Sequence, residues 1–407
     1  MNAAECPMPN AQCPMTIDPL TPLARFYHER LFADCVPFWL PRAVDEVHGG
    51  FLHCFDRDGT LVDDDKSVWA QGRMSWMLLT LYQEYERRPE WLAWAESGLR
   101  FLGERCVDPA DGRMFFQVAR DGTGIRKRRY AYSESFAAIA FAAHAAATGT
   151  GRSEEQARHW FRRFVEWNFL PNNAPPKFTT ARPLLGLGPR MITLVTAQEL
   201  VQHLGGDEEL TGWIDRCIDE IRTLFVKPEL EAVMEQVAPD GSISDHFDGR
   251  TLNPGHAIEG AWFILEEAWR RGGDPDLTTL GCQMLDWMWQ RGWDEECGGL
   301  YYFRDVYHKP VQEYWQAMKF WWPHDEALIA TLMAYRATRD AKYLAWHEQL
   351  REWSFRHFGD PEHGEWYGYL HRDGSVSSTL KGSLWKSFFH HPRALWRCHR
   401  LAAELEI

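Results

Sequence analysis

Apolar residues recur at three- and four-residue spacing along most of this chain, which is the pattern of amphipathic helices. The pattern predicts twelve helices, over 23–44, 68–87, 90–106, 133–148, 153–169, 190–204, 208–225, 256–271, 277–290, 326–338, 342–357 and a last segment after Pro392. Because the number is even, the helices can be grouped into six consecutive pairs.

Short aromatic segments and Asp-Gly turns lie between several of these pairs, and an aromatic strand followed by Asp-Gly is a hairpin signal. The Asp-Gly turns end at Gly59, Gly122, Gly241 and Gly374, and the aromatic segments are 50–53, 113–116, 299–303 and 365–369. The repeated unit is therefore helix, hairpin or loop, helix. Six such units predict an all-α toroid, an (α/α)6 barrel, with its hairpins walling a pocket at one end.

Composition and charge limit the partners and the cellular compartment that the chain is expected to have. The chain has 407 residues and a formal charge of −14, which argues against nucleic acid and anionic membrane as partners. It has no apolar run long enough for a membrane span, and its nine cysteines form no CxxC pair, which favours reduced thiols in the cytoplasm. Residues 1–22 are predicted to be a flexible leader, and 23–407 a single domain, with the proline-rich stretch 171–189 as a pocket-rim loop.

The candidate chemistry begins at the stretch from Asn253 to Trp262, which delivers a histidine into the first turn of a helix. Asn253 is a plausible cap, and His256 and Glu259 are three residues apart, so they share one helix face. Spacing alone favours a purely structural interpretation, in which His256 caps its helix and Glu259 hydrogen-bonds a neighbour. A second helix entrance near the C-terminus also carries histidines, His390 and His391.

These two stretches, NPGHAIEGAW and WK-(three residues)-HHPRAL, together with SVWAQGR at 67–73 and FWWPHDEA at 320–327, resemble the N-acylglucosamine 2-epimerase family. The resemblance spans roughly residues 23–403. It implies an (α/α)6 barrel and epimerisation at the carbon next to a sugar carbonyl. It places the catalytic roles on His256, His390, Arg73 and Glu326, and substrate binding on Glu259, Trp322, Met191 and Phe389. His391 departs from the pattern, so either of the two adjacent histidines could face the cavity.

The chemistry explains why such residues are needed. Inverting C2 requires a proton to leave one face and return to the other, which two histidines with a pKa of about 6.5 do most simply. Arg73 would be a fixed donor to the enediolate oxygen. Glu259 is expected to orient His256, and Glu326 to bind sugar hydroxyls or hold a histidine tautomer. No metal is needed, and the resemblance adds ATP as an activator that is not consumed and a homodimer as the assembly.

Several alternatives stay open from sequence. Sugar isomerase relatives carry a histidine on a middle helix, where this chain has Thr193, and its absence favours the N-acyl branch over epimerases or isomerases of unmodified sugars such as mannose or cellobiose. A glycoside hydrolase on the same toroid would use two carboxylates, with Glu259, Asp325 and Glu326 as candidates. A protein-binding role, known for some animal members, is a further alternative. His324 is expected to be structural, packing against Trp321 or Trp322.

Overall fold

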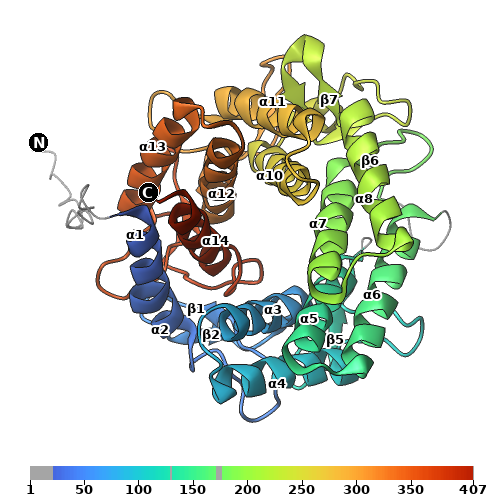
Figure 1. Ribbon diagram of the computed structural model, residues 1–407, viewed down its shortest axis with the longest axis vertical. Coiled ribbons are helices and arrows are strands. Elements are labelled where there is room, and N and C mark those ends of the chain that lie inside the picture. Colours follow the sequence, from blue (N-terminus) through green and yellow to red (C-terminus); the bar gives the residue numbers. More distant parts are fainter. Residues whose placement is uncertain (1–21, 129–130, 171–176, 407) are drawn as a thin grey trace, which may run out of the picture.

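The computed structural model describes residues 22–128, 131–170 and 177–406, so residues 1–21 of the predicted leader lie outside the described residues. Its helices form a closed ring of two layers (Figure 1). The inner layer consists of α3 (Val68–Glu84), α5 (Tyr132–Thr148), α7 (Leu187–Leu204), α10 (Pro254–Arg270), α12 (Trp321–Thr338) and α14 (His390–Leu405). The outer layer consists of α1 (Leu23–Glu29), α2 (Val36–Trp39), α4 (Pro89–Arg105), α6 (Gly151–Phe169), α8 (Glu208–Glu220), α11 (Pro275–Gly292) and α13 (Ala341–His357). The predicted toroid is confirmed.

The sequence of each helix decides its layer. Inner helices such as α12 are buried on all sides from Trp321 to Ala334, so other elements must enclose them. The outer helix α6 instead buries one stripe, which includes Trp160, Phe161 and Phe164, and turns its charged residues outward. The core of the protein therefore lies between the two layers and around the inner ring.

Several predicted helix boundaries were wrong. The segment 23–44 breaks into α1, a π-helical stretch (Arg30–Cys35) and α2, which ends at Trp39 just before Pro41, a residue without an N–H to donate. The segment 208–225 likewise ends in a π-helical stretch (Ile221–Phe225). By contrast, α12 and α14 begin earlier than predicted, since Pro323 and Pro392 are each accepted in a first turn.

The strands are short, and only part of the predicted hairpins form. β1 (Cys54–Phe55) pairs with β2 (Leu61–Asp63), and β4 (Gln117–Val118) with β5 (Gly124–Arg126), across two predicted Asp-Gly turns. β7 (Val226–Lys227) and β8 (Ala232–Val233) form another hairpin. Around Gly241 no such hairpin forms, and around Gly374 the turn closes a single bridge, Leu370 to Val376. The predicted aromatic strands mostly contribute isolated bridges as well, made by Phe51, Met114, Leu300 and Trp366.

Four strands connect the hairpins to the inner helices. β3 (Lys66–Ser67), β6 (Leu185–Gly186), β10 (Thr251–Leu252) and β12 (Lys319–Phe320) each run directly into an inner helix. Each pairs antiparallel with a strand further along the chain, namely β4, β9 (Gln236–Val237), β11 (Arg304–Asp305) and β13 (Tyr369–Leu370). The strands therefore gather at the N-terminal ends of the inner helices, which is where the candidate residues lie.

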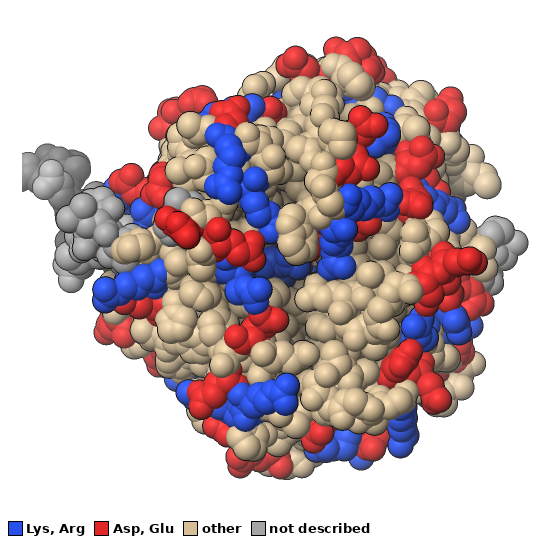
Figure 2. Space-filling model, viewed as in Figure 1, with Lys and Arg blue, Asp and Glu red and all other residues tan. Residues whose placement is uncertain are grey.

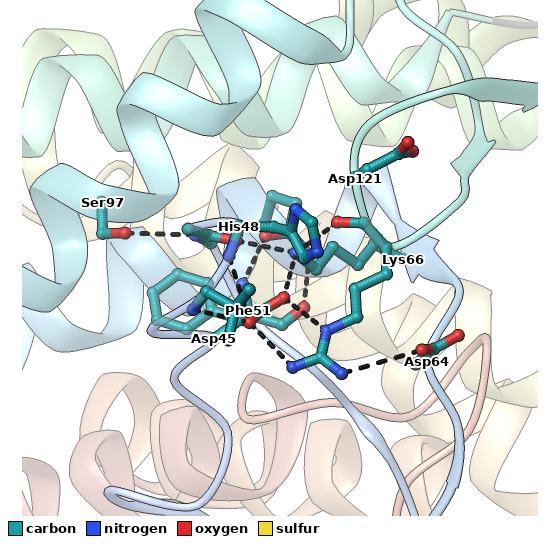
Figure 3. A network of polar contacts seen from close by, with 12 residues as sticks. Asp45, His48, Phe51, Asp64, Lys66, Ser97 and Asp121 are labelled. Carbon is teal, nitrogen blue, oxygen red and sulfur yellow. Dashed lines mark hydrogen bonds and ion pairs between the residues drawn. The ribbon is translucent and has the colours of Figure 1, made fainter.

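A buried ion pair holds the strand that precedes α3 (Figure 3). The Lys66 Nζ donates to Asp45 Oδ2 at 2.8 Å and to the carbonyl oxygens of Gly49 and Arg120 at 2.7 and 2.8 Å, and both charged side chains of the pair are fully buried. The Arg120 guanidinium also donates to both Asp45 oxygens. Burial by itself would raise the pKa of Asp45, but the donors from Arg120 and Lys66 hold it well below its usual range.

The same arrangement recurs before α12. Lys319 donates to Asp294 at 3.0 Å and to the carbonyl oxygen of Gly299, and Arg372 donates to both oxygens of Asp294. The turns around the two aspartates also match, since Gly49 and Gly298 donate backbone hydrogen bonds to the carbonyl oxygens of Asp45 and Asp294. The two networks fix the entrances of α3 and α12, the helices that carry Arg73 and Glu326.

The outer surface mixes charges of both signs. On the face shown in Figure 2, acidic and basic side chains lie interspersed rather than in separate patches of one sign. Within the described residues, none of the helices has the length and apolar character needed to cross a membrane.

Candidate active site

A cavity of about 1140 Å³ is lined by side chains from several inner helices and strands. Seven of the eight site residues predicted from sequence line it: Arg73, Met191, His256, Glu259, Trp322, Phe389 and His390. The eighth, Glu326, is fully buried and does not line the cavity. The sequence therefore identified residues that gather around one cavity, with Glu326 buried behind its wall.

The first turn of α10 is built to present His256. Asn253 is its N-cap, as predicted, and its side-chain oxygen accepts from the His256 N–H at 3.1 Å, while Pro254 opens the helix. Gly255 is required by close packing, because a Cβ there would lie 2.7 Å from the Trp322 ring. The His256 side chain is one-third exposed, and its ring lies 5.0 Å from that of Trp322.

Glu235, and not Glu259, orients His256. The His256 Nδ1 lies 3.1 and 3.0 Å from the two carboxylate oxygens of Glu235, which follows β8. The prediction that Glu259 accepts from this ring was wrong, because the Glu259 carboxylate accepts from Arg393 at 2.9 Å instead. With Nδ1 bound to Glu235, the Nε2 atom of His256 is the nitrogen left for a substrate.

His390 has a similar arrangement with a different carboxylate. It is the first residue of α14, and its Nδ1 lies 2.7 Å from Glu326 Oε1. The same oxygen accepts from Arg393 at 2.5 Å, and the other Glu326 oxygen accepts from the Trp262 indole at 2.8 Å. Of the two roles expected for Glu326, the geometry favours holding the histidine tautomer, since its oxygens are already used by protein donors.

The neighbouring histidines are structural. His391 is buried outside the cavity, with its Nδ1 2.9 Å from Asp325 and its ring stacked 4.1 Å from that of Trp366. The open choice between the adjacent histidines is therefore decided for His390. His324 is structural too, but it stacks on Trp353 at 5.1 Å, so the prediction that it packs against Trp321 or Trp322 was wrong.

Arg73 lies in the second turn of α3 between aromatic rings. Its guanidinium is 4.1 Å from the centre of the Phe136 ring and 4.8 Å from that of Phe389, and its Nε is buried without a hydrogen-bond partner. Among the described residues Arg73 forms no ion pair. Burial and the nearby Arg393 lower its pKa to about 9, so at neutral pH it remains a charged donor that can be used by a ligand oxygen.

The two histidines have opposite electrostatic surroundings. Burial opposes protonation of His256, but the charge and hydrogen bond of Glu235 outweigh it and raise its pKa. Burial lowers the pKa of His390 to about 3, and Arg73 and Arg393 add to that effect against the pull of Glu326. The surroundings therefore favour the protonated form of the His256 imidazole and the neutral form of the His390 imidazole.

Comparison with known proteins identifies the family of this chain. The family described as N-acylglucosamine 2-epimerase (GlcNAc 2-epimerase) matches residues 50–394. The N-acylglucosamine 2-epimerase of Bos taurus is 39% identical over 389 residues, which cover 91% of this chain and 89% of that protein. The chain belongs to the N-acylglucosamine 2-epimerase family.

Solved structures of more distant relatives share the fold. The cellobiose 2-epimerase of Bacillus thermoamylovorans B4167 superposes with a TM-score of 0.80 at 19% identity, covering 93% of this chain and 98% of its own. A D-mannose isomerase superposes with a TM-score of 0.78 at 19% identity, covering 92% of this chain and 97% of its own. At this identity the likeness supports the barrel and not the choice of sugar.

In the candidate site, Arg393 occupies a place where a metal could otherwise bind. Atoms of Glu259, Glu326 and His390 lie within 4.8 Å of one another, a spacing that suits a metal ion. One nitrogen of Arg393 donates to both carboxylates and lies 3.4 Å from His390 Nδ1. The guanidinium thus supplies the positive charge that these carboxylates require.

The position used to separate the branches of the family does not face the cavity. Thr193 is fully buried and donates to the carbonyl oxygen of Pro189, whereas its neighbours Ile192 and Val195 line the cavity. The absence of a histidine at Thr193 therefore says nothing direct about contacts with the sugar.

Sequence analysis missed Glu235 and Arg393. Arg393 carried a signal, because it lies three residues after His390 and so shares its helix face. Glu235 carried none, since it lies between two short strands and reaches His256 across the fold.

Proposed function

We propose that this chain interconverts N-acetylglucosamine and N-acetylmannosamine by removing and returning the proton at C2. The observation that carries the proposal is the presence of two histidines, His256 and His390, each with Nδ1 bound to a carboxylate, in the wall of one cavity. The identity of 39% with a named N-acylglucosamine 2-epimerase over most of both chains supports the same reaction.

The steps follow from this arrangement. In the open-chain sugar, the neutral imidazole takes the C2 proton, and the C–H electron pair moves into the carbon–carbon bond as the C1 carbonyl oxygen becomes an enolate oxygen. The intermediate is an enolate and not the enediolate of an unmodified sugar, because C2 carries the acetamido nitrogen. The other, protonated imidazole then donates its proton to the opposite face of C2, and the carbonyl re-forms. The sugar is neither oxidised nor reduced, and the two histidines exchange protonation states.

The remaining cavity residues assist these steps. Arg73 donates to the enolate oxygen, where negative charge develops, and its donors are already held in place by Phe136 and Phe389. Trp322 contacts both histidine rings, at 5.0 Å from His256 and 6.0 Å from His390, and offers a flat surface to the C–H face of a sugar.

The preference for an N-acetyl sugar is supported by the apolar part of the wall. Ile139 of α5 and Ile192 and Val195 of α7 line the cavity, and a methyl group buried against them is favoured by about 0.8 kcal/mol per carbon. A hydroxyl at C2 gains nothing from such a surface.

A glycoside hydrolase is disfavoured by the partners of the carboxylates. Among the described residues, the acidic side chains that line the cavity are Glu199, Glu235 and Glu259. Glu235 is held by His256, Glu259 by Arg393, and Glu199 accepts from the Trp76 indole. Hydrolysis needs two carboxylates turned toward one glycosidic bond.

Three expectations from the family resemblance remain proposals: a homodimer, a cytoplasmic location and activation by ATP without its consumption. Sedimentation of the pure protein tests the first, localisation in the source cell the second, and turnover with and without ATP, with ADP measured, the third.

The function is tested by incubating the pure protein separately with N-acetylglucosamine, N-acetylmannosamine, mannose and cellobiose in D2O and following C2 by NMR. We expect both N-acetyl sugars to reach the same mixture with deuterium at C2. Turnover of mannose to fructose, or of cellobiose to its epimer, in preference to the N-acetyl sugars would contradict the proposal.

A further inference from the structure

The two histidines are bound to carboxylates whose charges are balanced differently. Glu326, the partner of His390, also accepts from Arg393 and Trp262, so its negative charge is already matched by a guanidinium. Glu235, the partner of His256, forms an ion pair with His256 alone among the described residues. Its negative charge is therefore matched only when His256 is protonated.

Glu235 is fixed by its backbone at a junction of three elements. It lies between β8 and β9, its carbonyl oxygen accepts from the N–H of Leu187 at the start of α7, and its N–H donates to the carbonyl oxygen of Thr251 in β10. Since β10 leads into α10, the carboxylate and the histidine are held by the same strand. A side chain that is 15% exposed and anchored in this way is placed to orient His256 before substrate arrives.

The other charged groups around the two rings also differ. Near His256, Glu259 of its own helix favours the protonated ring and Lys177 from the segment before β6 opposes it, while α12 contributes the uncharged ring of Trp322. His390 faces two cations, Arg393 from its own helix and Arg73 from α3, and two carboxylates, Glu326 from α12 and Glu259 from α10, which lies within 4.8 Å of the ring and is itself bound to Arg393.

We propose that Glu235 is a positioning residue that holds His256 as the imidazolium in the free enzyme, so that His256 is the resting acid and His390 the resting base. This inference rests on the proposed function for its catalytic meaning. It implies that the free enzyme is poised for the epimer whose C2 proton faces His390. The opposite epimer requires the proton to move from His256 to His390 first.

The test uses Glu235→Gln, which keeps the shape of the side chain and removes its charge, and Glu235→Asp, which keeps the charge. Glu231→Gln is the matched control, because Glu231 is an exposed carboxylate in the nearby β7–β8 turn and does not line the cavity. His256 is titrated in each protein by NMR of ¹⁵N-labelled histidine, and kcat and kcat/KM are measured against pH for both epimers. Melting curves confirm that each variant is folded.

We expect the His256 titration to move to lower pH by about one to two pH units in Glu235→Gln, and to move less in Glu235→Asp. In Glu235→Gln, the limb of the pH–rate profile that reports His256 should also move to lower pH, with either epimer as the substrate. The value of kcat should fall about ten- to a thousandfold. Glu231→Gln should match the wild type.

An unchanged His256 titration in Glu235→Gln, or a fall in kcat without movement of that limb, would overturn the proposal and leave Glu235 a structural residue. If the wild-type protein turns over neither N-acetyl sugar, but the His256 titration still moves to lower pH in Glu235→Gln, the proposed function is refuted and the inferred pairing of Glu235 with His256 stands.

Discussion

Replacing Glu326 by Gln separates the role of its charge from that of its shape. Glu326 is fully buried and accepts three hydrogen bonds, from His390, Arg393 and Trp262. The Gln amide has one accepting oxygen, so its N–H₂ group must face either His390 and Arg393 or the Trp262 indole. If that group faces His390, the ring takes the wrong tautomer. If it faces Trp262, the indole loses its acceptor, at a cost of about 1–3 kcal/mol.

In either orientation the imidazolium of His390 loses the carboxylate that stabilises it. The corresponding change in a serine protease triad lowers kcat by about 10⁴, and we expect a loss of about 10³ to 10⁴ here, or ~4–5.5 kcal/mol. KM should stay within about threefold, because Glu326 does not line the cavity. Stability should fall as well, since Arg393 keeps only one of its two carboxylate partners.

The assay is steady-state epimerisation of both N-acetyl sugars by Glu326→Gln, His390→Asn and the double variant. Since the two residues act as one unit, the double variant should be little slower than either single one. Asp325→Asn is the matched control, because it breaks a histidine–carboxylate pair one residue away, outside the cavity. It should lower the melting temperature and leave kcat nearly unchanged. Losses that add in the double variant, or an equal loss in Asp325→Asn, would refute the reasoning.

Two further predictions concern residues outside the cavity. His391→Asn should keep kcat within about tenfold of the wild type and lower the melting temperature, because this ring packs in the core; a loss of epimerisation equal to that of His390→Asn would contradict its structural role. The free energy of unfolding should be higher above pH ~4 than below it. The pKa of Asp45 is lower in the folded chain than its unfolded value of about 3.9, so the folded chain binds fewer protons than the unfolded chain. The stability that Asp45 contributes is therefore lost as pH falls. Lys66→Met should lower the free energy of unfolding at pH 7 by about 3 kcal/mol and flatten this dependence, as denaturant titrations at several pH values would show; an unaltered dependence would contradict the role of the pair.

The fold was predictable because helical periodicity extends over most of the chain. Helix ends were less predictable, since a proline such as Pro323 or Pro392 is equally compatible with the residue before a helix and with its first turn. The prediction therefore started α12 at Glu326, five residues late, and began the last helix after Pro392 instead of at His390.

The candidate site was predictable as a set of residues and not as a set of contacts. Spacing along a helix suggested that Glu259 would serve His256, but it describes only neighbours on one element. Glu235 reaches His256 from between two short strands 21 positions away in sequence, which no local pattern reveals. The choice of His390 over His391 likewise depended on the residue at which α14 begins.

The central claim is that His256 and His390 serve opposite faces of C2, and isotope exchange in single variants tests it most directly. Each epimer is incubated in D2O with His256→Asn or His390→Asn, and loss of the C2 proton is followed by NMR. We predict that net epimerisation is abolished in both variants, with a loss of about two to four powers of ten, and that each variant exchanges the C2 proton of one epimer only, a different one in each. Near-normal epimerisation by both variants, or exchange of the same epimer by both, would contradict the account.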